Sequence, residues 1–204
     1  MNTKQKILYE ALSLFSVKGY SAVNVGEIAE AVGIKTPSLY KHYKSKQDIF
    51  NFCVVEFSKR IETMHNDMRL PESKKAAFAY DSISTEKLID VTTGLFLFYL
   101  QDDVASKFRK MLQIERYHNS EINAVYEDLF IEGSIKHEEE IFTELINKGV
   151  IKGNNAHVLA LRFYTPIFFL LQKYDMNHDQ IEDAKRELAL MVQDFRDTYV
   201  NAEN

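Results

Sequence analysis

Four side chains that can donate hydrogen bonds stand close together near the start of the chain: Ser38, Tyr40, Lys41 and His42. Hydroxyl, ammonium and imidazole donors of this kind bind phosphate oxygens and the edges of DNA bases. Elsewhere the sequence offers no nucleophile paired with a general base, and no glycine loop of the kind that cradles phosphate groups. The residue types therefore predict a surface that reads a nucleic-acid duplex, not the active site of an enzyme.

Two other positions could carry chemistry, and both have a simpler interpretation. Cys53 stands beside Phe52, Val54 and Val55, and we interpret it as a buried thiol that packs like a small hydrophobic group, not as a redox sensor. His137 is followed by three glutamates. No second His or Cys cluster stands nearby, so we interpret that run as the charged outer face of a helix. The sequence predicts neither a metal site nor a cofactor.

A pair of short helices is predicted to position the four donors. Asn24 can cap the first helix, and Glu27 can return a hydrogen bond to the Asn24 backbone amide. Gly33 ends that helix, because glycine enters the left-handed conformation cheaply. Thr36 and Pro37 predict the start of the second helix, with Thr36 as its cap and Pro37 at its first position.

The second helix has two different sides. Leu39 and Tyr43 fall on one side and are predicted to pack inward, which leaves the donors on the other. Residues 1–50 carry seven lysines against four acidic residues, a net charge of +3, whereas the remaining residues carry −8, so that the whole chain has −5. A basic head on an acidic body is typical of a protein that touches nucleic acid at one end.

The rest of the chain predicts helices only, because it has few glycines and prolines and no sustained alternation of apolar and polar residues. We expect an all-α fold with an N-terminal three-helix helix-turn-helix DNA-binding domain (residues 1–46) and a C-terminal helical domain (residues 47–204), to which the family resemblance of residues 7–50 assigns ligand binding and dimerisation. A long helix from about residue 45 to residue 69 would link the two domains, and residues 70–83 have the character of a connector. The other predicted helices span residues 4–18, 85–101, 104–118, 121–148, 155–174 and 179–200.

The last two predicted helices carry apolar residues that a second copy of the chain could cover. Residues 158–171 are apolar nearly all the way round, and the final helix repeats apolar residues at alternating steps of three and four. The alternative is that both helices complete the core of a single chain. The predicted dimer interface comprises Leu161, Phe169, Ile181, Leu188, Met191 and Phe195.

The middle helices are rich in aromatic and methionine side chains, most of which we expect in the core. Some would line an apolar ligand pocket with Glu115 or Arg116 as a polar anchor, and such a pocket favours an apolar or aromatic ligand over a sugar. The predicted pocket residues are Phe96, Tyr99, Met111, Glu115, Tyr126, Phe130 and Phe168.

The composition of the chain bears on whether it has a core, a disulfide or a membrane span. A hydrophobic content of 46% with 12% aromatic residues is ample for a core, and the single cysteine excludes an internal disulfide. No run of 18 apolar residues and no secretory signal is present. We therefore expect a soluble protein of the cytoplasm.

Residues 7–50 follow the pattern Ile7-Leu-x3-Ala11-x3-Phe15-x3-Gly19-Tyr20-x7-Ile28-Ala29-x3-Gly33-Ile34-x4-Leu39-Tyr40-x-His42-Tyr43-x2-Lys46. This pattern, which covers about a quarter of the chain, closely resembles the TetR family of bacterial one-component transcriptional repressors. The resemblance implies a homodimer with two DNA-binding heads, a helical ligand-binding body and dimerisation through the last two helices. It also implies a palindromic operator that is released when a small molecule binds.

The resemblance further implies which residues face DNA. Those residues are Thr36, Pro37, Ser38, Tyr40, Lys41 and His42, together with Lys46, which would clamp a phosphate at the start of the long helix. One departure from the family stands at Val25 and Gly26, where members often carry polar residues. Base readout would then rest on residues 36–42 alone.

Our leading hypothesis is a homodimeric repressor released from a palindromic operator by a small, largely apolar ligand. The first alternative is a regulator of the same family without an inducer, acting as an activator or under the control of a partner. The remote alternative is a helical enzyme or carrier that uses the same cavity.

Overall fold

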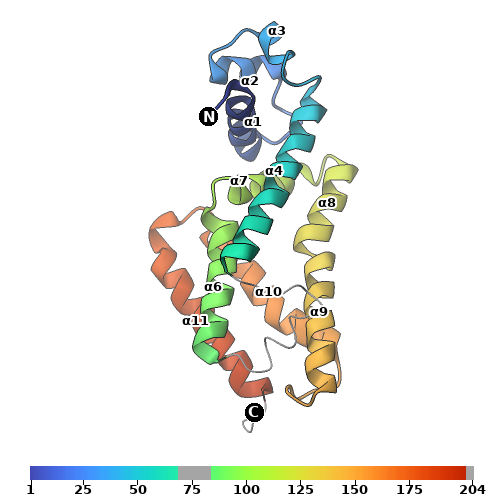
Figure 1. The fold of residues 1–204 in the computed structure, drawn as a ribbon. Helices are drawn as coiled ribbons and strands as arrows, with labels where there is room; N and C mark the ends of the chain where they lie inside the picture. Colours follow the sequence, from blue (N-terminus) through green and yellow to red (C-terminus); the bar gives the residue numbers. More distant parts are fainter. Residues whose placement is uncertain (69–83, 201–204) are drawn as a thin grey trace. The chain divides into compact units, whose positions relative to one another are not determined.

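A computed structural model describes residues 1–68 and 84–200, and the regular elements of these residues are helices joined by turns (Figure 1). The prediction of an all-α chain is confirmed. The connector predicted at residues 70–83 lies outside the described residues. Of the helices described, none combines the length and the apolar character needed to cross a membrane.

The chain divides into two compact units. The first comprises Met1–Met64 and Gln101–Tyr126, and the second comprises His65–Leu100 and Glu127–Asn204. The predicted boundary after residue 46 falls inside the first unit. Residues 101–126, which we expected in the C-terminal domain, share a unit with the helix-turn-helix.

The first unit contains the predicted helix-turn-helix. Helix α1 buries Ile7, Leu8, Ala11, Leu12 and Phe15 along one face, because these residues recur at helical spacing. The helices of this unit are α1 (Thr3–Lys18), α2 (Val25–Val32), α3 (Thr36–Leu39), α4 (Lys46–Asp67, of which the residues to Met64 belong here), α7 (Ala105–Glu115) and the first part of α8 (Ser120–Phe130).

The predicted capping box of α2 is confirmed. Asn24 Oδ1 accepts a hydrogen bond from the Glu27 amide at 3.0 Å, and Glu27 Oε2 accepts one from the Asn24 amide at 2.8 Å. Gly33 ends the helix with a φ of 80°, in the left-handed region that favours glycine. These local signals fix both ends of α2 and hence the corner that leads to α3.

The predicted start of α3 is wrong by one residue. The extended backbone of an N-cap is found at Lys35, so Thr36 is already helical and makes no capping hydrogen bond from its side chain. The start of α4 agrees with the prediction, because Ser45 Oγ accepts a hydrogen bond from the Asp48 amide at 3.0 Å.

Among the residues that the structure describes, the second unit contains four longer helices: α6 (Thr85–Gln101), α9 (Glu132–Asn147), α10 (Ala156–Tyr174) and α11 (Ile181–Tyr199), with a 3-10 turn at His178–Gln180. One apolar cluster joins α9, α10 and α11 through Phe142, Leu159 and Phe195. A second joins α6, α10 and α11 through Phe96, Leu170 and Leu188.

The single helix predicted over residues 121–148 is wrong, because the structure breaks it at Ile131 between α8 and α9. Gly133 packs so closely against the preceding turn that an added Cβ would lie 1.8 Å from the carbonyl oxygen of Asp128. Ser134 Oγ donates to the carbonyl of Leu129 at 2.8 Å, which satisfies an acceptor released by the break. The periodicity of the apolar residues alone did not reveal this break.

Candidate nucleic-acid interface and ligand cavity

The residues predicted to contact DNA lie on α3 and the turn after it. The exposed residues among them are Pro37, Tyr40, Lys41 and His42. Thr36 and Ser38 are half-buried. Leu39 and Tyr43, only 0% and 2% exposed, lie beneath them. The structure thus presents the donors of residues 36–42 as one short surface that is supported from below by apolar contacts.

That surface is anchored to α1 and α4. The Tyr43 hydroxyl donates to the carbonyl of Lys4 at 3.0 Å, and burial raises the pKa of Tyr43 to about 12, so the phenol stays protonated as a donor. The Lys4 ammonium lies 4.0 Å from the centre of the Phe52 ring. Because these contacts fix Tyr43, the donors next to it along the chain keep a defined position.

Lys46 has an internal role that sequence reasoning missed. Its ammonium donates to the carbonyls of Tyr20, Ser21 and Val23 at 2.9, 3.3 and 2.8 Å, and it lies 4.4 Å from the centre of the Tyr20 ring. Burial lowers the pKa of Lys46, while Glu115 opposes that shift. The ammonium therefore supports the turn between α1 and α2, and its predicted phosphate contact stays a prediction. Backbone carbonyls carry no sequence signal, which is why the role was not foreseen.

Glu115, predicted as a pocket anchor, lies in the unit that holds the helix-turn-helix. Its carboxylate is 2% exposed and accepts hydrogen bonds from the Ser21 amide, at 2.9 Å, and from the Ser21 hydroxyl. An added Cβ at Gly19 would lie 3.0 Å from Glu115 Oε2, and Gly19 has a φ of 83°. The geometry makes Glu115 a tie between α7 and the turn after α1.

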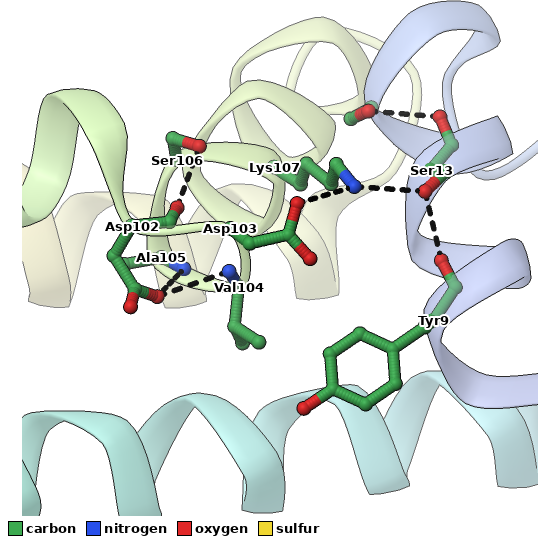
Figure 2. Close-up of polar contacts among 9 residues, drawn as sticks. Tyr9, Ser13, Asp102, Asp103, Val104, Ala105, Ser106 and Lys107 are labelled. Carbon is green, nitrogen blue, oxygen red and sulfur yellow. Dashed lines mark hydrogen bonds and ion pairs between the residues drawn. The ribbon is translucent and has the colours of Figure 1, made fainter. Parts of the chain in front are cut away.

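Figure 2 shows how α7 begins and where it meets α1. Asp102 Oδ1 accepts hydrogen bonds from the amides of Val104 and Ala105 at 3.0 and 2.9 Å, which caps the helix. The Lys107 ammonium bonds Ser13 Oγ of α1 at 3.0 Å and the carboxylate of Asp103 at 2.7 Å (Figure 2). Polar contacts near the start and the end of α7 thus bind this helix to α1 and to the turn that follows α1.

Two further predicted pocket residues belong to this first unit. Met111 is fully buried, and Tyr126 is 2% exposed with the Arg116 guanidinium 4.2 Å from its ring centre. Neither residue lines the cavity of the second unit. Both act as core in this structure.

The second unit encloses a cavity of about 360 Å³. Three of the seven predicted pocket residues line this cavity: Phe96, Tyr99 and Phe130. Phe168 of α10 does not line it and packs against Tyr164. The other apolar groups on the wall come from α6, α9, α10 and α11 and include Leu95, Ile141, Phe142, Phe163, Ile167, Leu171 and Phe195. The volume lies within the range of pockets for small organic ligands.

The interpretation of residues 137–140 as an outer helix face is wrong for Glu138, which is half-buried, whereas His137 and Glu140 are exposed. His137 and Glu138 line the cavity, whereas Glu139 bonds His157 Nδ1 at 3.0 Å. Burial raises the pKa of Glu138 to about 7. The signal was present in the sequence, because residue 138 shares helical spacing with the buried residues Ile141 and Leu145.

The six residues predicted for the dimer interface divide by exposure. Leu161 and Phe169 of α10 are 36% and 62% exposed, and Ile181 and Met191 of α11 are half-buried. Leu188 and Phe195 are buried within the second unit and complete its own core. Leu190 of α11, which we did not predict, is 65% exposed.

Cys53 is fully buried, and burial raises the pKa of its thiol to about 12. Within residues 1–68 and 84–200, no three His, Cys, Asp or Glu side chains come together as a metal site.

Comparison with known proteins matches the N-terminal part of the chain to a family of bacterial regulators. Residues 7–52 match the family described as bacterial regulatory proteins, tetR family. The chain is 31% identical over 119 residues to the HTH-type transcriptional regulator AcrR of Shigella flexneri, which covers 58% of this chain and 50% of that protein. It is 45% identical over 51 residues to IcaR, the negative transcriptional regulator of the biofilm operon icaADBC in Staphylococcus epidermidis, covering 25% of this chain and 28% of that protein. The chain thus spans half or less of the length of these relatives.

The likeness of fold extends over the whole chain. The complex of SmeT with triclosan superposes with a TM-score of 0.66 at 17% identity, and covers 100% of this chain and 94% of that one. SmeT is the repressor of the multidrug efflux pump SmeDEF of Stenotrophomonas maltophilia. The match over residues 7–52, the capped helix-turn-helix and the shared all-α fold agree, and residues 7–52 form a helix-turn-helix that matches the tetR family of bacterial regulatory proteins.

Proposed function

We propose that the protein is a homodimeric transcriptional repressor of the cytoplasm, which binds a palindromic DNA operator and leaves it when a small, largely apolar ligand binds. The observation that carries this proposal is the row of donors at residues 36–42, held outward by buried Leu39 and Tyr43 in a head that matches the family. The relatives AcrR and IcaR, both named as transcriptional regulators, support it.

DNA readout would follow from the exposed surface. Lys41 would contact a phosphate, while Tyr40 and His42 would reach phosphates or base edges in the major groove. In a dimer the two α3 helices would enter successive major grooves about one helical turn apart. Dimerisation would use the outer side of α10 and α11, where Leu161, Phe169 and Leu190 are exposed.

Release by a ligand would use the cavity of the second unit. A ligand shifts the balance between two conformations only through its different affinity for them, and a coupling of about 1–3 kcal/mol suffices for control. Helix α4 passes from the first unit to the second at Met64 and His65, and His65 lines the cavity. This helix is therefore our candidate for carrying the effect of the ligand to the head. The SmeT–triclosan complex supports a ligand site in this fold.

Selection of random duplex DNA by the purified protein tests the proposal. We expect enrichment of a palindrome, bound with a Kd of about 10⁻⁸ M or tighter at physiological salt. Fluorescence anisotropy on the enriched duplex then compares Tyr40→Ala with Tyr117→Ala, since both tyrosines are exposed in the first unit but only Tyr40 lies on the α3 surface. Loss of binding in the first variant alone supports the proposal, whereas equal binding by both removes Tyr40 from the DNA surface.

A further inference from the structure

We propose that the cavity of the second unit takes a lipophilic cation, with Glu138 as the group that binds its positive charge. The inference rests on the proposed function, in which this cavity holds the effector, and it names the chemical class of that effector.

Glu138 lies in the largely apolar wall of this cavity. It stands on α9 one turn before Ile141 and Phe142, and faces a cavity lined also by Phe96, Ile167 and Leu171. Among the described residues, no side chain or backbone donor bonds its carboxylate and no cation pairs with it. Glu138 is half-buried, and a carboxylate that lies against apolar side chains without a partner is costly, so a positively charged ligand gains more here than a neutral one.

Three hydroxyl groups on the same wall already donate to backbone carbonyls. Thr92 Oγ1 donates to the carbonyl of Leu88 at 2.8 Å, Ser134 Oγ to that of Leu129 at 2.8 Å, and the Tyr164 hydroxyl to that of Phe130 at 2.7 Å. Each hydroxyl has a single proton to donate. None of the three is therefore left to bind an anionic ligand.

The other ionisable groups on the cavity wall come from helices α4, α6, α8, α9, α10 and α11. His65 of α4, Asp128 of α8 and His137 of α9 are all exposed, which places them in contact with solvent. Arg196 of α11 lies close enough to Glu86 to lower the pKa of that carboxyl. Tyr99 of α6 is neutral, because burial raises its pKa to about 12. The negative charge of Glu138 thus has no counter-ion among these groups, and Asp128 adds a second negative charge.

Aromatic rings supply the second half of a cation site. Tyr99 and Phe130 meet edge to face at 5.5 Å, and Phe163 packs against Phe142 at 5.8 Å, all four on the cavity wall. Ring faces attract alkylammonium groups that are shielded from water. The same rings bind the apolar remainder of the ligand.

Binding of a permanent cation would be coupled to loss of a proton. Since burial raises the pKa of Glu138 to about 7, about half of the empty protein carries a protonated carboxyl at neutral pH. A cation favours the ionised form, so affinity should rise with pH from 6 to 8 and level off above. Burial lowers the pKa of His137, which lines the same cavity, and a variant at residue 138 separates the effect of His137 from that of Glu138.

The test is isothermal titration calorimetry with three probes that share one alkyl chain: decyltrimethylammonium, decanol and decanoate, each below its micellar concentration. At pH 8 we expect the cation to bind at least about tenfold more tightly than the alcohol, with decanoate weakest. Glu138→Gln should remove this preference and the rise with pH, while leaving decanol binding unchanged. Glu144→Gln is the matched control, because it removes the same charge from an exposed position of α9 that does not line the cavity.

Each outcome decides the proposal. Tightest binding of decanoate, a cation preference that survives Glu138→Gln, or no binding of the cation would overturn it. The three probes are titrated into the protein without DNA, and operator binding is measured separately on the same sample. Failure of the proposed function would appear as no operator binding whatever the probes do, so the two failures are distinguishable.

Discussion

At the scale of single residues, two lysines with the same sequence prediction have different surroundings. Lys41 is exposed on the α3 surface, whereas the Lys46 ammonium bonds three carbonyls of the turn after α1. The sequence placed both near DNA, because a lysine's partner is visible in sequence only when the partner is another side chain. The donors Tyr40, Lys41 and His42 are exposed and Ser38 is half-buried, and their side of the chain was predictable because buried Leu39 and Tyr43 mark the opposite side.

Alanine substitution of these two lysines should separate stability from DNA binding. Lys46→Ala removes a charged donor from three carbonyls that water can partly rehydrate, so we expect the free energy of unfolding to fall by about 1–2 kcal/mol. Lys41→Ala should leave stability unchanged and reduce the salt dependence of operator binding by about one unit of slope. Urea denaturation and anisotropy at two salt concentrations measure the two effects. An unchanged denaturation midpoint for Lys46→Ala would show that its three hydrogen bonds contribute nothing net.

The pH dependence of stability is a second prediction at this scale, and it concerns Glu138. Its pKa is raised from the ordinary value of 4.5 to about 7 on folding, so the folded state holds a proton that the unfolded state loses between these values. The contribution of this group to stability is therefore present below pH 4.5 and is lost as the pH rises through 7. Glu138→Gln should stabilise the protein at pH 8 by about 1–3 kcal/mol and much less at pH 5. Denaturation at both pH values checks this, and an equal effect at both would refute the assignment.

At the scale of elements, the ends of helices were predictable where side chains mark them. The capping box of α2 stands where the sequence places it, and α4 begins close to the predicted residue 45, with Ser45 as its cap. The break between α8 and α9 was not predictable from periodicity, because it depends on a close approach of Gly133 to the Asp128 carbonyl. A contact between a glycine and a backbone oxygen has no pattern in the sequence.

Gly133→Ala tests this account of the break. The added Cβ would lie 1.8 Å from the Asp128 carbonyl oxygen, so the backbone must shift and we expect a loss of about 1–3 kcal/mol of stability. Gly94→Ala is the matched control, because its Cβ would meet only the flexible end of Met68, which can move aside. Its effect should stay within about 1 kcal/mol. Equal effects in the two variants, read from thermal denaturation, would contradict the account.

At the scale of the whole molecule, the all-α class followed from composition and periodicity, but the grouping of helices did not. Helix α7 joins the unit of the head through Ser13, Ser21, Lys107 and Glu115, contacts between residues about 94 apart in sequence. Pairings at such separation leave no local pattern. For the same reason Met111, Glu115 and Tyr126 were expected in the pocket and lie instead in the first unit.

Dimerisation is the prediction that belongs to this scale. Phe169→Glu places a charge at a side chain that is 62% exposed in the single chain, so we expect the variant to remain helical and to sediment as a monomer with much weaker operator binding. Met176→Glu, at an 84% exposed position beyond the end of α10, is the control and should remain a dimer. A dimeric Phe169→Glu variant would exclude this face of α10 from the interface.

The most direct test of the central claim is hydroxyl-radical footprinting of the protein on its selected duplex. A dimer that reads DNA with two α3 helices should protect two patches, related by the two-fold axis of the palindrome and about one helical turn apart or at a multiple of that spacing. Protection of a single half-site, or protection that does not depend on sequence, would contradict a dimeric operator-binding repressor.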